Sequence, residues 1–321
     1  MRLRSLAALA LALLLALPGL AAAAGRPAPG RLRVHVGPVI RAGGADLALT
    51  GQWVRIRGEV APYVAGQRVS VRIRQGVRVR VRVRRLAVRP SPSGRTGRFS
   101  LVVSSPRPGR LGVRIGHRGT RAQKRFVGAP VRILVYSGAL GPGSHGPLVS
   151  VLQRQLAAEG YAVPRSGNFE PATGRAVLAF RKVNRMARTT FAPRSILGAL
   201  LRRRGAFRAR YPRHGRHIEA DLSRQVMAEL EGGRVVRVYV VSSGKPSTPT
   251  VLGSFRFYRK DLGTNQKGMV DASYFYGGYA IHGYAEVPTY PASHGCLRIP
   301  VPDARAVHDW IRLGMPIDVY P

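Results

Sequence analysis

Two runs between residues 71 and 84 alternate strictly between an aliphatic residue and an arginine. The runs 71–74 and 77–84 flank the pair Gln75-Gly76. A period of two places successive side chains on opposite faces of a strand, so this segment predicts two β-strands and excludes a helix. Every aliphatic residue has an odd number, which predicts that they share one face, and Gln75-Gly76 predicts a two-residue hairpin turn.

Short runs typical of strands continue beyond this hairpin. Phe99–Val103 and Leu111–Ile115 are two of them, and Ser, Pro and Gly residues separate the runs. About 100 residues of short strands at this spacing are typical of a small β-sandwich of the immunoglobulin-like class. We therefore expect residues 31–130 to form an N-terminal β-sandwich.

The chain is strongly basic. Its formal net charge is +39. Residues 31–130 contain 23 Arg and Lys against the two acids Asp46 and Glu59. Such a charge favours anionic partners. Two interpretations stay open, namely an arginine face that binds an anionic cell-wall polymer, and a solvated face without a specific partner.

Residues 1–24 have the pattern of a secretory signal peptide. Two arginines precede an uncharged apolar run, and Ala22-Ala23-Ala24 offers a cleavage site. The alternative is an uncleaved anchor, because residues 6–24 are just long enough to span a bilayer. With cleavage we expect a secreted protein of the cell wall or periplasm that keeps no membrane span and meets no nucleic acid.

Residues 138–201 change to helical spacing. Apolar residues recur at Leu148, Val151, Leu152 and Leu156, and further helical pieces are expected at 174–183 and 190–201. This region resembles the peptidoglycan-binding three-helix module. The matching residues are Gly141 to Leu148, Gln153, Leu156, Gly160-Tyr161, Pro171 to Gly174, Ala176-Val177 and Phe180. The resemblance implies attachment to the cell wall.

From residue 210 to residue 321 the sequence again predicts mainly β-structure. Expected strands are Ile218–Leu222, Val235–Val241, Phe255–Arg259, Tyr279–His282 and Ile317–Tyr320. One amphipathic helix is expected at about 303–313, with Asp303 as its N-cap and with Val307, Trp310 and Ile311 on its inner face.

The single cysteine of the chain lies in Ser293-His294-Gly295-Cys296-Leu297-Arg298, and His282 lies upstream in Ala280-Ile281-His282-Gly283. A thiol needs an imidazole or a positive field to react as a thiolate near neutral pH. Gly295 permits a tight backbone whose N–H groups form an anion nest, which is an oxyanion hole for acyl transfer. Arg298 adds fixed charge beside the sulfur.

This pattern closely resembles the catalytic signature of the L,D-transpeptidases of the YkuD type. Ser243-Gly244-Lys245 and Thr248-Pro249-Thr250 also match that family. The resemblance implies a mainly β catalytic domain at residues 210–321. It implies Cys296 as nucleophile, His282 as general base, Gly283 as the residue whose carbonyl orients the base, and His294 and Gly295 as the shapers of the oxyanion hole.

The implied reaction is acyl transfer on peptidoglycan stem peptides, without cofactor or metal. Cys296 attacks a tetrapeptide stem, D-Ala leaves, and an amine resolves the thioester into a 3→3 cross-link. We expect Arg298 and Ser293 to bind substrate. Tyr274 and Tyr276 are expected in the donor groove, and the segment 284–292 is expected to form a small lid.

Two other classes of function remain as alternatives. In the first, His282, His294 and Cys296 are zinc ligands with Glu286 or Asp303 as a fourth, although His-x-Cys is not a common zinc spacing. A zinc or cysteine L,D-carboxypeptidase would trim stem peptides instead of linking them. In the second, the chain is a non-catalytic wall-binding protein.

Overall fold

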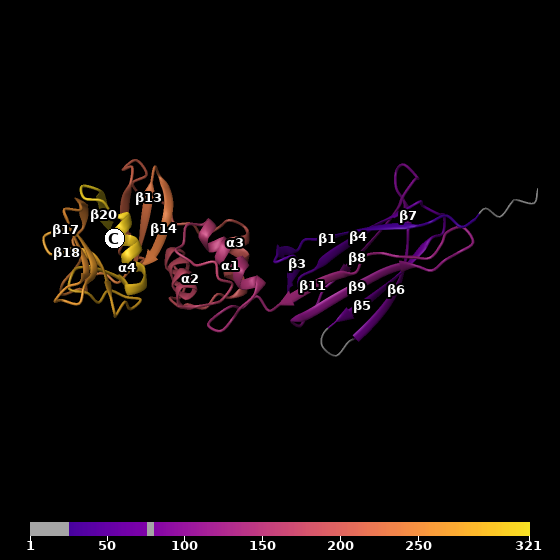
Figure 1. Ribbon diagram of the computed structural model, residues 1–321, viewed down its shortest axis with the longest axis horizontal. Coiled ribbons are helices and arrows are strands. Elements are labelled where there is room, and N and C mark those ends of the chain that lie inside the picture. The colour runs from indigo at the N-terminus through magenta and orange to yellow at the C-terminus, as the bar shows by residue number, and fades with distance from the viewer. Residues whose placement is uncertain (1–25, 76–79) are drawn as a thin grey trace, which may run out of the picture.

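The computed structural model describes residues 26–75 and 80–321. The predicted signal peptide at residues 1–24 lies outside this range. A β-rich part, a helical part and a second β-rich part follow one another along an elongated molecule (Figure 1). In the described ranges no helix is long and apolar enough to cross a membrane.

The N-terminal part consists of two β-sheets packed face to face. The strand β4 (Val54–Ala61) buries Val54 and Ile56 in the common core and exposes Arg55 and Arg57. The first sheet has the order β1 (Arg31–Gly37), β4, β8 (Gly97–Val103), β7 (Arg89–Pro90). The second has the order β2 (Ile40–Ala42), β3 (Ala45–Leu49), β11 (Val131–Tyr136), β9 (Gly109–His117), β5 (Arg68–Gln75), β6 (Arg80–Ala87), with β10 (Phe126–Val127) beside β9.

The hairpin of β5 and β6 forms as predicted, but the predicted phase of its side chains is wrong. Gln75 belongs to β5 and pairs with Arg80, so the connection comprises residues 76–79, which lie outside the described range. A connection with an even number of residues pairs odd positions with even ones. Val83 therefore lies opposite Arg72 on the outer face and is 61% exposed.

Three helices follow the sandwich, namely α1 (Pro147–Ala158), α2 (Pro171–Val183) and α3 (Arg194–Leu201). The predicted inner face of α1 is confirmed, because Leu148, Val151, Leu152 and Leu156 are all buried. Two of the helices begin with proline, which fits the first turn because an N–H there has no intrahelical acceptor.

The helices share one hydrophobic core with both β-rich parts. Leu47 and Leu49 of β3 contribute from the N-terminal side. Val226 and Val238 contribute from the C-terminal side, where they lie on β13 (Val226–Glu231) and β14 (Arg234–Val240). The helical part is therefore packed against the C-terminal sheet and is not a free spacer (Figure 1).

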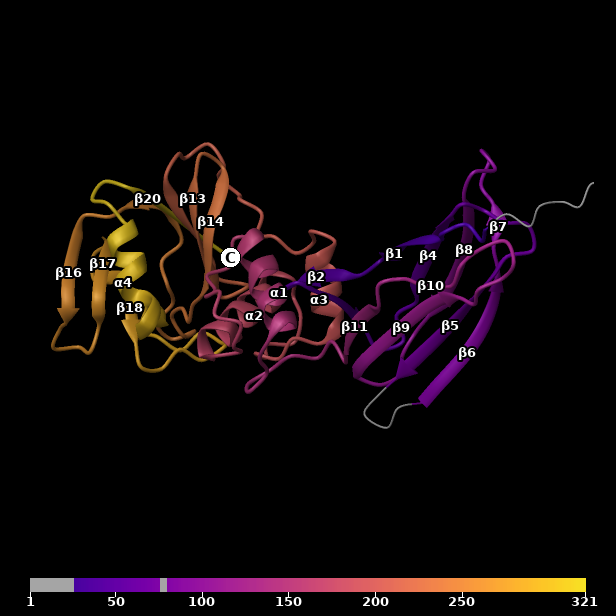
Figure 2. The same ribbon diagram turned by 45° about the vertical axis from the view of Figure 1, so that its right-hand side comes forward.

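The C-terminal part contains two sheets, with α4 beside the strands of the smaller one (Figure 2). The larger sheet has the order β14, β13, β12 (His217–Asp221), β20 (Pro316–Tyr320), β15 (Gly253–Arg256). The smaller has the order β16 (Arg259–Thr264), β17 (Val270–Tyr276), β18 (Tyr279–Tyr284), β19 (Leu297–Pro300).

The predicted strand at 255–259 is wrong. The strand β15 ends at Arg256 and β16 begins at Arg259 in the other sheet, so the chain passes between the sheets at this point. Phe257 is buried in the core between the sheets, and its N–H donates to the carbonyl of Met315 at 3.0 Å. The alternating apolar residues at 255–259 therefore belong to a segment that crosses from one sheet to the other, and not to one continuous strand.

The predicted helix near residue 303 is α4 (Val301–Trp310), which begins earlier than predicted. Pro300 stands at the N-cap, and Asp303 lies in the first turn, so the prediction of Asp303 as N-cap is wrong. Its carboxylate is instead engaged by a side chain of α2. Val307 and Trp310 are buried as predicted, in the core between the two sheets.

Candidate active site

Cys296 and His282 are positioned by two neighbouring parallel strands. Cys296 directly precedes β19, and His282 lies in β18 opposite Arg298 of β19. Ile281 and Leu297, the adjacent pair in this register, are buried in the core between the sheets. Because side chains alternate along a strand, Cys296, His282 and Arg298 lie on the opposite face of the sheet.

These three side chains line one cavity of about 600 Å³, together with Ser293 and His294. With Tyr274, which also lines it, the cavity brings together six of the residues that the sequence predicted for the site. His282 is 3% exposed, whereas Cys296 is only partly buried. The sulfur therefore lies at a surface that a substrate can reach, beside a base that is shielded from water.

His282 is held by a main-chain carbonyl. Its Nδ1 lies 2.9 Å from the carbonyl oxygen of Gly283. A carbonyl only accepts, so this bond assigns the proton to Nδ1 and leaves a lone pair on Nε2. Burial lowers the pKa of His282; the Gly283 bond offsets part of this effect, and the charge of Arg298 lowers the pKa further. His282 is therefore a neutral base at rest.

The thiol of Cys296 is also neutral at rest. Burial raises its pKa, and the backbone of Ala280 and the charges of Arg298 and Lys267 offset part of the rise. Its Sγ lies 3.6 Å from the carbonyl oxygen of Gly278, the geometry of a weak S–H donor. The resting pair is accordingly a thiol beside an imidazole, and not a preformed thiolate with an imidazolium.

The turn that leads into Cys296 is closed by Ser293. Its Oγ donates to the carbonyl of Cys296 at 2.6 Å and accepts from the N–H of Gly295 at 3.0 Å. Gly295 has a φ of +118°, and a Cβ at this position would lie 2.5 Å from a ring carbon of Tyr279. Only glycine fits both this backbone and this contact. The Ser293 hydroxyl thus shapes the turn.

Residues 242–250, which follow β14, form hydrogen bonds to this turn and to the start of β19. Ser242 and Arg298 exchange two backbone hydrogen bonds of 3.0 Å. The hydroxyl of Thr250 donates to the carbonyl of Gly295 at 2.7 Å and accepts from the N–H of Gly244 at 2.8 Å. The residues that resemble the family motif upstream of the site are therefore a support for the cysteine turn.

Comparisons with known proteins agree with this geometry. The model of the YkuD family, the L,D-transpeptidase catalytic domain, matches residues 215–319, which include His282 and Cys296. An L,D-transpeptidase crystal structure from Xylanimonas cellulosilytica DSM 15894 is 32% identical with a TM-score of 0.51, over 56% of this chain and 97% of that chain. The chain belongs to the L,D-transpeptidase family.

Further L,D-transpeptidases of known structure match a smaller share of the chain. L,D-transpeptidase 1 of Mycobacterium tuberculosis is 26% identical over 33% of this chain and 62% of that chain, with a TM-score of 0.28. A mutant L,D-transpeptidase of Enterococcus faecium is 27% identical over 33% of this chain and 50% of that chain, with a TM-score of 0.30. The search of curated proteins gave no match.

In this L,D-transpeptidase a further wall of the cavity comes from β16 and from the turn between β16 and β17. Arg259, Asn265 and Lys267 line the cavity from this segment. The guanidinium of Arg259 lies 3.9 Å from the ring centroid of Tyr274, and Nδ2 of Asn265 lies 3.4 Å from the Tyr274 hydroxyl. Sequence reasoning missed these residues because no motif marks them, and only pairing of β16 with β17 brings them to the site.

The two tyrosines predicted for the donor groove have different positions. Tyr274 is buried and lines the cavity. Tyr276 is 52% exposed, does not line the cavity, and packs its ring against Phe255 and Tyr279. A register shift in the pairing of β17 with β18 between Tyr274 and Tyr276 separates the two side chains, although they stand two residues apart.

The segment 284–292 is fastened along the helical part, and among its residues only Tyr284 lines the cavity. The guanidinium of Arg298 lies 4.0 Å from the ring centroid of Tyr284. The carbonyl of Thr289 accepts a hydrogen bond from Arg188, which follows α2. The expected lid over the site is therefore not the arrangement in this enzyme.

Of the side chains named for the zinc alternative, His282, His294 and Cys296 line one cavity, and neither Glu286 nor Asp303 joins them there. His294 is exposed, with its Nε2 3.3 Å from Nζ of Lys245, and Asp303 is paired with Arg175. Over residues 26–75 and 80–321, no group of three or more His, Cys, Asp or Glu residues is arranged to hold a metal ion.

Proposed function

We propose that this protein is a peptidoglycan L,D-transpeptidase that works through a thioester on Cys296. The observation that carries the proposal is the shared cavity of Cys296 and His282, with Nδ1 of His282 bonded to the Gly283 carbonyl. That bond leaves the Nε2 lone pair available to a proton donor in the cavity. Family membership agrees with the reaction class, and the arrangement of the described side chains supports the individual roles.

The first half of the reaction forms the thioester. Nε2 of His282 accepts the thiol proton as Sγ attacks the carbonyl carbon of the third stem residue. The resulting oxyanion is placed near the Cys296 turn, where we assign the N–H of Cys296 as a donor. The Gly295 N–H is already bonded to Ser293, so Gly295 and His294 act through the shape of the turn. The C–N bond breaks, and D-Ala leaves with the proton held by His282.

The second half transfers the acyl group. The amine of a neighbouring stem attacks the thioester carbon and gives a proton to His282 as the C–S bond breaks. Sγ takes the proton back, and a 3→3 cross-link results. A neutral Cys296 thiol and a neutral His282 imidazole suit this order of steps, because the base is unprotonated when each attack begins. Attack by water would give the carboxypeptidase outcome with the same residues.

Substrate binding is assigned to the charged and aromatic walls of the cavity. Arg298 faces the cavity with its guanidinium on Tyr284, where it can pair with a carboxylate of the stem. Tyr274 forms part of the donor wall with Arg259. Ser293 contributes through the turn that it closes. We assign no substrate contact to Tyr276.

The remaining assignments concern the rest of the chain. We propose that residues 138–201 are the peptidoglycan-binding module, that residues 31–130 belong to an immunoglobulin-like sandwich, and that residues 210–321 are the catalytic domain. We also propose that residues 1–24 direct export, so that the protein acts in the cell wall or periplasm. The helices share a core with β13 of the larger C-terminal sheet, which supports the proposal that wall attachment and catalysis belong to one packed unit.

A defined substrate tests the proposal. The purified protein is incubated with a disaccharide tetrapeptide, and the products are identified by mass spectrometry. A cross-linked dimer that lacks one D-Ala is expected, together with a thioester on the peptide that contains Cys296. The variant Cys296→Ala should form neither. Tripeptide without dimer would establish the carboxypeptidase alternative, and full activity of Cys296→Ala would refute the mechanism.

A further inference from the structure

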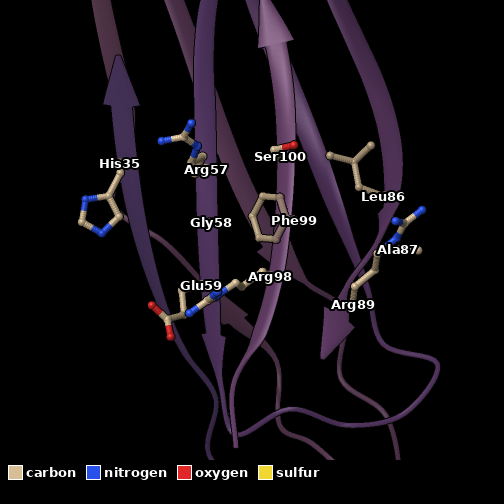
Figure 3. Close-up of a pocket in the computed structure, with 10 residues that line it drawn as sticks. All are labelled: His35, Arg57, Gly58, Glu59, Leu86, Ala87, Arg89, Arg98, Phe99 and Ser100. Atoms are coloured by element: carbon tan, nitrogen blue, oxygen red, sulfur yellow. The ribbon is translucent and has the colours of Figure 1, made fainter. Parts of the chain in front are cut away.

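The sandwich is hollowed along β4 of the first sheet, and the hollow reaches β6 of the second sheet. A cavity of about 780 Å³ and one of about 460 Å³ lie on this sheet, and both are lined by His35 and Arg57. The larger one is drawn in Figure 3, where its lining residues come from β1, β4, β6, β7 and β8. Because the two cavities share a wall, we treat them as one groove, the β4 groove.

The β4 groove carries more positive than negative charge, because four arginines and one acid, Glu59, line its two cavities. The strand register places Arg89 directly opposite Arg98 on one side of β8, and Glu59 opposite Arg98 on the other side. Like charges in directly opposed positions destabilise a sheet. Glu59 is the one acid that lines either cavity, and its Oε1 already accepts from the Thr96 hydroxyl at 2.7 Å. An anion seated in the groove would remove this repulsion.

The groove also offers apolar surface of the kind that binds sugar rings. Trp53 lines its smaller cavity and is 69% exposed, which is unusual for so large an aromatic side chain. Phe99 and Leu86 line the larger cavity between the basic side chains (Figure 3). Phe99 is only 7% exposed, so Trp53 is the ring that offers a free face for stacking. Arginines provide bidentate donors for carboxylates and phosphates.

We propose that the β4 groove binds an anionic polysaccharide of the cell wall, a chain of sugar rings that carry carboxylate or phosphate groups. From Trp53 to Glu59 the strand extends about 20 Å, at about 3.3 Å per residue, which is long enough for several sugar rings. The choice of a glycan over another polyanion rests on the proposed function at the wall. The groove and the catalytic cavity lie in parts at opposite ends of the elongated chain (Figure 1).

The test uses the full chain and a polygalacturonate fragment of about ten residues as the probe. Binding is followed by calorimetry and by tryptophan fluorescence at about 0.15 M salt, where the Debye length is about 8 Å. Arg57→Ser should weaken binding at least about tenfold, the loss of a charge-assisted hydrogen bond. Trp53→Leu should abolish the fluorescence change, since Trp310 is buried. Both wild-type side chains point outward, so the core is unaffected.

The matched control is Arg114→Ser, which removes the same charge from the outer face of β9 in the other sheet. Its affinity should stay within about twofold of the wild type, because nearby charges outside a contact are screened by salt. An equal loss of affinity in Arg114→Ser would show that the probe binds through the overall positive charge and not in the groove, and would overturn the proposal. Tighter binding of single-stranded DNA of equal charge would overturn the choice of a glycan.

Thioester formation on Cys296 is measured in the same samples. Arg57→Ser and Trp53→Leu should acylate at the wild-type rate, because they lie in the sandwich. A failure of polygalacturonate binding with normal acylation would reject the groove and leave the catalytic proposal in place. Normal polygalacturonate binding without acylation of Cys296 would reject the catalytic proposal and leave the groove proposal in place.

Discussion

Arg175 of α2 donates two hydrogen bonds to Asp303 of α4, from Nε to Oδ2 and from Nη2 to Oδ1, each 2.9 Å long. Both side chains are about one-fifth exposed. The helical part and the helix beside the catalytic strands are thereby joined through a bidentate ion pair. A Cβ on Gly283 would lie 2.7 Å from Cβ of Ala304, so α4 in turn packs directly on the strand of His282.

Loss of this ion pair should destabilise the catalytic part. Arg175→Met removes two charge-assisted hydrogen bonds and leaves the carboxylate of Asp303 without its partner, which costs about 1–3 kcal/mol in free energy of unfolding. Denaturant unfolding followed by tyrosine and tryptophan signals measures this change. The control is Arg305→Met in the Arg305–Asp309 pair, whose side chains are 64% and 54% exposed and which should matter little. Equal stabilities of the two variants would show that the Arg175 pair does not join the parts.

The thiol of Cys296 should titrate above the ordinary range of a cysteine, because burial disfavours the thiolate. The rate of alkylation by iodoacetamide against pH should therefore have its midpoint above about 8.5. Arg298→Gln should move that midpoint still higher, since it removes a charge that favours the thiolate. Arg312→Gln, an exposed change away from the cavity, should leave it in place. A lower midpoint in Arg298→Gln would contradict the assigned position of Arg298.

In the profile of kcat/KM against pH, the midpoint of the acid limb should lie below the ordinary histidine pKa of about 6.5. Burial and Arg298 lower the pKa of His282, so the imidazole stays an unprotonated base to a lower pH than an exposed histidine does. In Arg298→Gln the limb of kcat/KM should shift to higher pH. The measurement is a pH profile of thioester formation with a tetrapeptide donor. A limb that stays fixed would remove His282 from the role of base.

Gly295→Ala should inactivate the enzyme without unfolding it. The new methyl would meet the ring of Tyr279 at 2.5 Å, and the φ of +118° is strained for alanine. The turn must shift, and a displacement of about 1 Å at a nucleophile costs roughly a hundredfold in rate. Gly314→Ala is the control, because it has a φ of +81° with nothing within 4 Å of the added Cβ. Comparable activity in the two variants would mean that the turn has no part in catalysis.

Several features of the site were predictable because they depend on local chemistry. Cysteine, histidine and glycine in Ser293-His294-Gly295-Cys296 predict a nucleophile in a tight turn, and His282 followed by glycine predicts its partner. The fold class of the two β-rich parts followed from periodicity, which is also local. Asp303 was misjudged for the same reason, because a short acid before an apolar helix usually caps it, and here a distant arginine takes the carboxylate.

The sequence by itself determined the family and the alternation of mainly β and helical regions, and it predicted Cys296 and His282 as the reacting pair. Each of these depends on residues that lie close together along the chain. Only the tertiary structure decided which faces those residues share. Pairing of β18 with β19 turns His282 and Cys296 to one cavity, and pairing of β16 with β17 adds Arg259 to its wall. Strand register is fixed by contacts between segments far apart in the chain, and no local pattern records it.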